Sequence, residues 1–203
     1  MAEILSALDG HVIAGRRGAV TEAPGVILSE RQGLITVQLT AWPDTAAGVA
    51  AKAGEIAGTP MPPSMRLGIT GAGGKPTVLQ VGPERWWFLV SPTSDLGKRL
   101  QDGFPADQAV VTDLSHARTI VTITGPKGRD LLARILPIDT DPVVLPAGSV
   151  AQSVMHGVGV LLHFFATGAD GDIYDLHIPR SFALSHWEWL VHVAEGLGVE
   201  VRG

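Results

Sequence analysis

The sequence predicts an α+β protein of two βαββαβ-like halves with largely antiparallel sheets. Short segments rich in β-branched and aromatic residues alternate with amphipathic helical patterns along the chain. In addition, residues 87–96 and 174–184 repeat one order: a strand, a proline, a serine and a helix. We expect an N-terminal arm or short strand at residues 1–23, a first half at 24–112 and a second half at 113–203, in one compact unit.

The first half is expected to open with two strands, residues 25–29 and 34–40. The polar residues 30–33 between them end in glycine, which is typical of a hairpin turn. Residues 44–56 are alanine-rich, start with an acid and stop before Gly58, so they predict a helix. The other elements expected here are strands at 67–70, 77–81, 86–90 and 109–112 and a helix at 93–100.

The second half opens on the clearest pattern in the chain, DLSHARTIVTITGPKGRDLLAR at residues 113–134. Its β-branched run at 118–124 predicts a half-buried strand, which Gly125 and Pro126 end. An amphipathic helix at 127–135 follows. The remaining elements expected are strands at 150–155, 158–165, 172–178 and 199–201 and a helix at 181–197.

The composition argues against several classes of protein. Of the 203 residues, 45% are hydrophobic and 17% charged, against an average of about 25% charged, which suggests that a partner covers part of the surface. The absence of cysteine excludes disulfides, thiolate zinc sites and cysteine-ligated iron–sulfur clusters. A net charge of -5 without a basic run argues against nucleic acid as a partner.

The distribution of apolar residues bears on the membrane. No apolar window reaches the ~18 residues of a membrane-spanning helix. An acid, Glu3, stands near the start, where a signal peptide would carry bases. We therefore expect a cytoplasmic protein with no membrane partner.

Asp113, Ser115, His116 and Arg118 form a polar cluster that suggests a hydrolase. Adjacent side chains on a turn or strand point to opposite faces, however, so this cluster cannot form a catalytic triad. We favour an aspartate that caps a turn and an arginine that pairs with a nearby carboxylate or with a partner subunit. No catalytic residue is predicted on this chain.

Two patterns suggest ligand binding, but neither is complete. Residues 71–76, GAGGKP, could cradle an anion, yet they lack the Walker spacing and no helix follows, which favours a plain loop. His156, His163 and His177 fall on or near strands of one expected meander. A zinc site usually has a fuller set of ligands, so satisfied or interfacial histidines are favoured and no metal is expected. No dinucleotide fingerprint follows a strand, so no flavin or NAD is expected on the chain.

Aromatic residues indicate surfaces that other elements or subunits cover. Trp86 and Trp87 are adjacent, so their strand would present a ring to each face of its sheet. In the last helix, Trp189 falls off the stripe that faces the core. Tryptophan and arginine are enriched at interface hot spots, which indicates a subunit interface. A wide core with one incidental surface ring stays open as the alternative. The interface candidates are Trp189, Arg180, Trp86 and Arg118.

Several segments together resemble the gamma subunit family of heterotetrameric sarcosine oxidase. Between residues 77 and 197 they are, in order, VGPERWWFLV, DLSHARTIVTITGPKGRDLLARILPID, LPAGSVAQSVM, VLLH and DLHIPRSFALSHWEWL. The resemblance implies a non-catalytic, structural subunit of a complex that oxidises sarcosine to glycine and transfers the one-carbon unit to tetrahydrofolate. It also implies partner alpha, beta and delta subunits that carry FAD, FMN, NAD and tetrahydrofolate, with no cofactor on this chain.

The second half is also similar, more distantly, to the folate-binding domain of glycine-cleavage aminomethyltransferases. That family has an Asp-Leu-Ser-His segment, a strand, a Gly-Pro turn and a helix, followed by a glycine-rich hairpin and an acidic strand beside the folate. Here residues 151–169 contain no Asp or Glu, and the side chains of Leu161 and Leu162 cannot accept a proton. The resemblance therefore implies an aminomethyltransferase-like fold without the aminomethyl chemistry. Two alternatives stay open: a stand-alone folate-binding one-carbon-transfer protein, or the gamma subunit of a related N-methyl amino acid dehydrogenase.

Overall fold

The computed structural model describes residues 5–19, 23–168 and 171–203. The chain divides into two compact units. The first unit is Gly33–His116, and the second is Ala117–Gly203 together with the described residues before Gly33. The expected division at residues 24 and 113 differs from this one, because strand β2 (Val26–Glu30) pairs with two strands of the second unit, residues 118–124 and 199–202.

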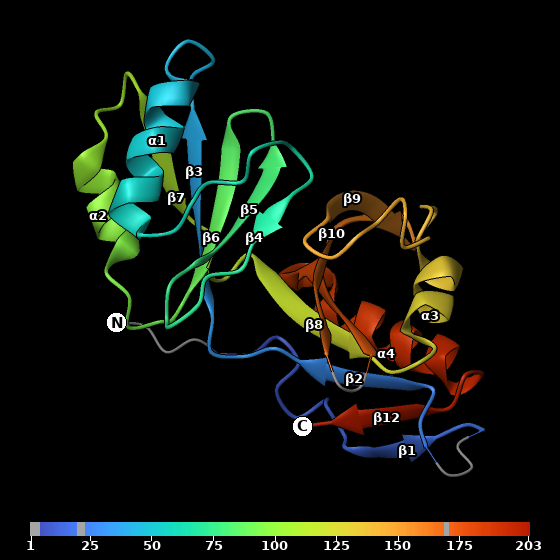
Figure 1. The fold of residues 1–203 in the computed structure, drawn as a ribbon. Helices are drawn as coiled ribbons and strands as arrows, with labels where there is room; N and C mark the ends of the chain where they lie inside the picture. The colour runs from blue at the N-terminus through green and yellow to red at the C-terminus, as the bar shows by residue number, and fades with distance from the viewer. Residues whose placement is uncertain (1–4, 20–22, 169–170) are drawn as a thin grey trace. The chain divides into compact units, whose positions relative to one another are not determined.

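The first unit consists of five strands and two helices (Figure 1). They are β3 (Ile35–Ala41), α1 (Ala46–Ala57), β4 (Gly68–Ile69), β5 (Thr77–Gly82), β6 (Arg85–Val90), α2 (Leu96–Gly103) and β7 (Ala109–Asp113). The strands form an antiparallel sheet in the order β4-β5-β6-β3-β7. Because side chains alternate between faces, Trp86 packs in the apolar cluster beneath the helices, while Trp87 on the other face donates from Nε1 to Gln38 Oε1 over 2.9 Å.

The second unit has a larger sheet, with helices α3 and α4 on one face (Figure 1). Besides β2 its elements are β1 (Gly15–Arg17), β8 (Arg118–Thr124), α3 (Gly128–Ile135), β9 (Val150–Met155), β10 (Val158–Gly168), β11 (Gly171–Pro179), a 3-10 turn (Arg180–Phe182), α4 (Ala183–Glu195) and β12 (Val199–Arg202). The strand order is β1-β12-β2-β8-β11-β10-β9. Leu132 of α3 and Trp187 and Leu190 of α4 pack on buried side chains of this sheet. Among the helices of the described residues, none is long and apolar enough to cross a membrane.

The two units repeat one order of elements. Strand, helix, three strands, helix, strand describes both β3–β7 and β8–β12. The sheet orders also correspond, except that β2 is inserted between β8 and β12 and β1 is added at the edge. The predicted α+β class, the two similar halves and the largely antiparallel sheets are therefore confirmed. The repeated order has one more strand than βαββαβ, and the second unit adds β1 and β2 to it. Among the pairs of described strands, β2 with β12 alone is parallel.

The predicted hairpin across residues 30–33 is wrong. Strands β2 and β3 lie on either side of this turn but belong to different sheets. The backbone N–H of Arg31 instead donates to the carbonyl of Ile120, over 2.9 Å, which continues the pairing of β2 with β8. Turn composition predicted the end of the strand correctly, but it carries no information on which strand pairs with it.

Replacing Gly125 by alanine is expected to lower the free energy of unfolding by about 2 kcal/mol. Gly125 directly follows β8 and has a φ of +100°. A Cβ added to it would lie 2.6 Å from the carbonyl oxygen of Gly25. The same oxygen accepts the Lys127 N–H over 2.8 Å, so it is not free to move away. Urea unfolding measures the loss. The matched control is Gly33→Ala, because Gly33 has a φ of +74° with open space around its Cβ position. If both variants lose the same free energy of unfolding, the contact between the added Cβ and the Gly25 carbonyl oxygen does not destabilise the protein.

Candidate functional site

A row of polar side chains crosses the face of the larger sheet that points away from α3 and α4. Thr122 on β8, Asp175 on β11 and His163 on β10 are paired in register across the three strands. His177 lies two residues along β11 on the same face, and Arg31 follows the end of β2. We call Arg31, Thr122, His163, Asp175 and His177 the polar row.

Asp175 is the centre of the polar row. Asp175 is 0% exposed. The Thr122 hydroxyl donates to Oδ1 over 2.8 Å, and Nη1 of Arg31 donates to Oδ2 in an ion pair. Burial raises the pKa of Asp175, against the lowering effects of the Arg31 charge and of both hydrogen bonds. Arg31 is therefore the group that makes a buried carboxylate tolerable at this position.

Arg31 forms the outer end of the row. Its side chain is 30% exposed, whereas that of Asp175 is fully buried. The guanidinium carbon lies 4.4 Å from the centre of the Phe165 ring, within the range of a cation–π contact. The ring of Phe165 also meets that of His163 edge to face at 5.6 Å. Arg31 is thus held from two sides, by a carboxylate and by an aromatic face.

The two histidines of the row are both 0% exposed. Burial, and then the nearby charge of Arg31, lower the pKa of His163 to about 4. Burial also places the pKa of His177 well below its usual value. Among the described residues, neither ring nitrogen of His163 has a hydrogen-bond partner. Both imidazoles are therefore neutral at pH 7, and the row carries one buried ion pair, Arg31 with Asp175.

The polar row has the chemistry of an acid–base site but lacks access. A general acid or base must come within hydrogen-bond reach of the group it protonates or deprotonates. His163, Asp175 and His177 have no exposed surface that a substrate could contact in this conformation. Within residues 5–19, 23–168 and 171–203, no group of three or more His, Cys, Asp or Glu side chains could hold a metal ion. The arrangement is suited to fixing the register of β8 and β11, which the Thr122–Asp175 bond joins.

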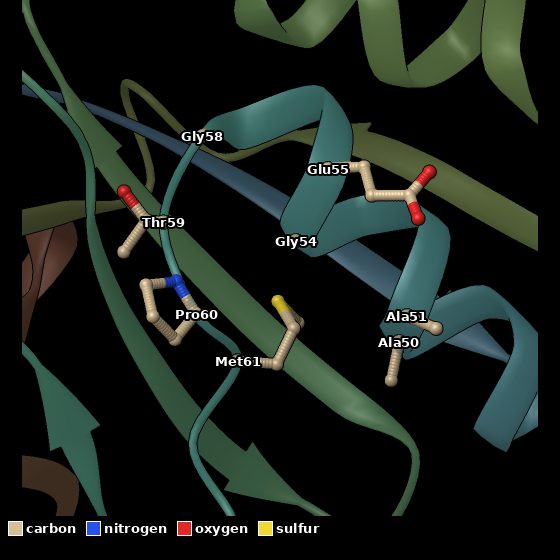
Figure 2. A pocket seen from close by; sticks show the side chains of 8 residues that line it. All are labelled: Ala50, Ala51, Gly54, Glu55, Gly58, Thr59, Pro60 and Met61. Atoms are coloured by element: carbon tan, nitrogen blue, oxygen red, sulfur yellow. The ribbon is translucent and has the colours of Figure 1, made fainter.

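Two surface grooves lie elsewhere. The first, of about 400 Å³, runs between α1 and the chain that follows it, with Gly54, Glu55 and Met61 in its lining (Figure 2). The second, of about 260 Å³, lies between the segment before β1 and helix α4, and Trp187 and His192 help to line it. No residue of the polar row lines either groove.

The polar cluster at the start of the second half is a turn. The Asp113 carboxylate accepts the backbone N–H of Ser115 over 2.8 Å and also accepts the Ser115 hydroxyl. These two bonds, with the hydroxyl first, lower the pKa of Asp113. Arg118 donates from Nη1 to the His177 carbonyl over 3.2 Å, and burial lowers its pKa. Asp113 therefore caps a turn, as the sequence predicted.

The predicted interface residues lie in different environments. Trp86 is 4% exposed and belongs to the apolar cluster of the first unit, so little of its ring is open to a partner. Arg118 is half-buried on β8. Trp189 is half-buried on α4 and stacks on His156, with 5.1 Å between ring centres. Arg180 donates to the carbonyl of Leu5 over 2.7 Å. Trp189 and Arg180 thus lie on one region, at helix α4 and the turn before it.

Sequence reasoning missed the polar row because it looked for a carboxylate in residues 151–169. The carboxylate of Asp175 instead comes from the next strand, which pairs with β10 in register. One signal was present in the sequence. Asp175 and His177 alternate with Tyr174, Leu176 and Ile178, which is the period-2 pattern of a strand with one apolar and one polar face.

Comparison with known proteins gives three findings. The family model for the sarcosine oxidase gamma subunit family matches residues 43–195. A chain of the heterotetrameric sarcosine oxidase from Corynebacterium sp. U-96 superposes with a TM-score of 0.74 at 23% identity, covering 92% of this chain and 91% of that one. Glycine cleavage system aminomethyltransferase T from Bartonella henselae gives a TM-score of 0.63 at 11% identity, covering 87% of this chain and 47% of that one. No curated protein sequence matches this chain significantly.

The two structural likenesses show a shared fold. The family match shows, in addition, a similarity of amino-acid sequence. It begins before α1 and ends within α4, so it includes most of both units. Such a span cannot come from one short motif. The chain therefore belongs to the sarcosine oxidase gamma subunit family.

Proposed function

We propose that this chain is the non-catalytic, structural gamma subunit of a heterotetrameric sarcosine oxidase-type complex. The complex would oxidise sarcosine to glycine and transfer the one-carbon unit to tetrahydrofolate. Alpha, beta and delta subunits would be its partners and would carry FAD, FMN, NAD and tetrahydrofolate. The observation that carries the proposal is the family match over residues 43–195, which spans both units.

A structural role agrees with the chemistry of the chain. The acid–base groups of the polar row are sealed from solvent, and Arg31 and Thr122 already use the carboxylate of Asp175. The buried bonds from Arg31 and Thr122 to Asp175 would contribute to a unique register of β8 against β11. The chain would then act by presenting a rigid surface to its partners.

A second candidate is a stand-alone folate-binding one-carbon-transfer protein. Its support is the structural likeness to aminomethyltransferase T, together with the carboxylate of Asp175 on β11 of the larger sheet. The burial of this carboxylate and its pairing with Arg31 count against it. The gamma subunit of a related N-methyl amino acid dehydrogenase would share the surface and the fold, and would differ in the substrate of the partner subunits.

We expect the purified chain to be colourless and to bind no tetrahydrofolate, and to join a yellow complex when it is produced together with the alpha, beta and delta subunits. Size-exclusion chromatography with absorbance at flavin wavelengths measures the assembly, and calorimetry measures folate binding. Oxidation of sarcosine, compared with N-methylglutamate, distinguishes an oxidase of sarcosine from a related dehydrogenase. A lone chain that enters no complex and binds tetrahydrofolate tightly would overturn the proposal in favour of the one-carbon-transfer protein.

A further inference from the structure

Strand β9 is an open edge of the larger sheet. It lies beside β10, and among the described strands no other pairs with it (Figure 1). Its Val154 is 49% exposed, so this edge is accessible at that point. The edge of a sheet presents a row of backbone N–H and C=O groups, and the structure that matches such a row is another extended strand.

The other edges of the two described sheets have protective features that β9 lacks. Strand β1 has three residues, two of them arginine, and β4 has two residues. Strand β7 lies against α2 and ends at Asp113. Short length and charge keep an edge from pairing with another chain. Strand β9 has six residues with no charge and no proline, and its described pairing with β10 has no bulge. It is therefore the edge best suited to pair with a further strand.

The turn at the end of β9 determines which of its backbone groups face outward. Met155 and Val158 flank the two-residue turn, so they exchange hydrogen bonds with each other. In an antiparallel pair, such residues alternate with residues whose N–H and C=O groups point away from the partner strand. On β9 these groups point away from β10 at Val150, Gln152 and Val154. An added strand would meet the backbone at these positions.

The sequence of β9 is nearly the same in both directions. Residues 150–154 are Val-Ala-Gln-Ser-Val, so a valine and then a small residue stand on each side of Gln152. A second copy that lies antiparallel across a twofold axis at Gln152 would pair Val154 of each copy with Val150 of the other. Both valines direct their backbone groups outward, so each pair would exchange both of its hydrogen bonds. Strand β9 is thus complementary to itself in one register.

No charge opposes this register. Residues 142–168 contain no Asp, Glu, Lys or Arg, so the two copies of β9 would bring no like charges together. Like charges directly opposite each other on neighbouring strands would destabilise the pairing. The register also places the turn residue His156 opposite Gly148, which has no side chain. The turn of one copy therefore meets the smallest residue of the other.

We infer that two copies of this chain pair antiparallel through β9, with a twofold axis at Gln152, so that the larger sheet continues from one copy into the other. The occupant is a second copy because β9 matches itself in residue type and in the direction of its backbone groups. The inference goes beyond the proposed function and is independent of it, since this pairing requires no chain other than this one.

Cysteine cross-linking tests the pairing and its register together. The chain has no cysteine, so an introduced thiol reports on one position. At the twofold axis the two Gln152 Cα atoms would lie about 5.5 Å apart, within the range of a disulfide. Gln152→Cys is therefore expected to form a covalent dimer with oxidised glutathione, seen by non-reducing electrophoresis. The matched control is Val154→Cys, which is also exposed but would lie roughly 14 Å from its counterpart along the strands, too far for a disulfide.

Sedimentation equilibrium of the full chain measures the Kd of the dimer without a cross-link. Val154→Lys is expected to weaken this Kd at least about tenfold, because a lysine on an edge strand opposes pairing with another chain. The matched control is Val110→Lys, because Val110 is 45% exposed on the edge strand β7. Its Kd is expected to stay within about twofold of wild type. Both valines are exposed, so the melting temperature should remain nearly unchanged in both variants.

Each outcome decides for or against the pairing. A chain that stays monomeric over a roughly hundredfold range of concentration overturns the inference. A dimer in which Val154→Cys cross-links as readily as Gln152→Cys, or which Val154→Lys leaves within about twofold of wild type, uses another register or surface and overturns it as well. Assembly with the alpha, beta and delta subunits tests the proposed function separately. Its failure would leave the β9 dimer as it is, and loss of the β9 dimer would leave the gamma-subunit role as it is.

Discussion

Replacing Arg31 by methionine is expected to lower the free energy of unfolding by about 3 kcal/mol. The substitution leaves the carboxylate of Asp175 buried at 0% exposure without its guanidinium partner. Removing one partner of a buried ion pair typically costs about 3–5 kcal/mol, and the partial exposure of Arg31 places the loss at the lower end. Equilibrium unfolding in urea at pH 7.5 measures it.

Two further variants show whether the loss comes from the unpaired carboxylate. Arg31→Met combined with Asp175→Leu removes both charges, and it should recover most of the stability, because buried ion pairs can often be replaced by apolar residues at little cost. Lys98→Met is the control for losing an exposed ion pair. Lys98 and Asp102 pair on the surface of α2, where such pairs contribute about 0–1 kcal/mol. If Arg31→Met is as harmless as Lys98→Met, the polar row does not depend on its ion pair.

The protein is expected to lose stability as the pH falls from about 6.5 to about 4. Over this range the unfolded chain takes up a proton on His163, but the folded protein does not, because its pKa is lowered to about 4. The contribution of His163 to stability is complete above the pKa that this residue has in the unfolded chain. It is lost as the pH falls toward the pKa that His163 has in the folded protein. One group shifted by this much accounts for roughly 3 kcal/mol. His177 acts in the same direction.

Asp175 opposes this loss at the acid end. Its pKa is raised in the folded state, so there the folded protein binds a proton more readily than the unfolded chain does, which stabilises the folded form on acidification. Unfolding in urea at pH 7.5, 6.5, 5.5 and 4.5 gives the net profile. His163→Leu should flatten it, by up to about 1.4 kcal/mol per pH unit. His192→Gln is the control, because its side chain is 81% exposed, and its profile should follow wild type. An unchanged slope in His163→Leu would contradict the prediction.

The elements of the fold could be predicted from sequence because their signals are local. The β-branched run of β8 and the apolar stripe of α3 are visible in windows of seven or eight residues. Pairing between distant strands has no such signal. Strand β2 was expected beside β3, its neighbour in the chain, but it pairs with β8 and β12, far away in sequence. Its membership in the second unit depends on contacts that no local pattern records.

The same reason explains what could and could not be predicted of the site. Trp189 and Arg180 were proposed as interface candidates from residue type, and for Trp189 from helix geometry, which are local properties, and this prediction stays a prediction. The polar row brings together Arg31, Thr122 and Asp175 from three distant segments, and their meeting depends on the register of β8 against β11. The stacking of His156 on Trp189 was equally hidden, because it depends on how the β9–β10 turn lies against α4.

The insertion of β2 between β8 and β12 has a consequence for synthesis on the ribosome. Residues of the first unit are translated together, so that unit can close its sheet while the rest of the chain is still being made. β1 and β2 are translated before the first unit, but they cannot pair until their partner strands have been made. β2 can pair with β8 only after the whole first unit has been translated, and β1 can pair with β12 only after residues 199–202 have been made. A premature stop just before Val199 would leave β1 with no strand to join, although every residue of β1 had been made.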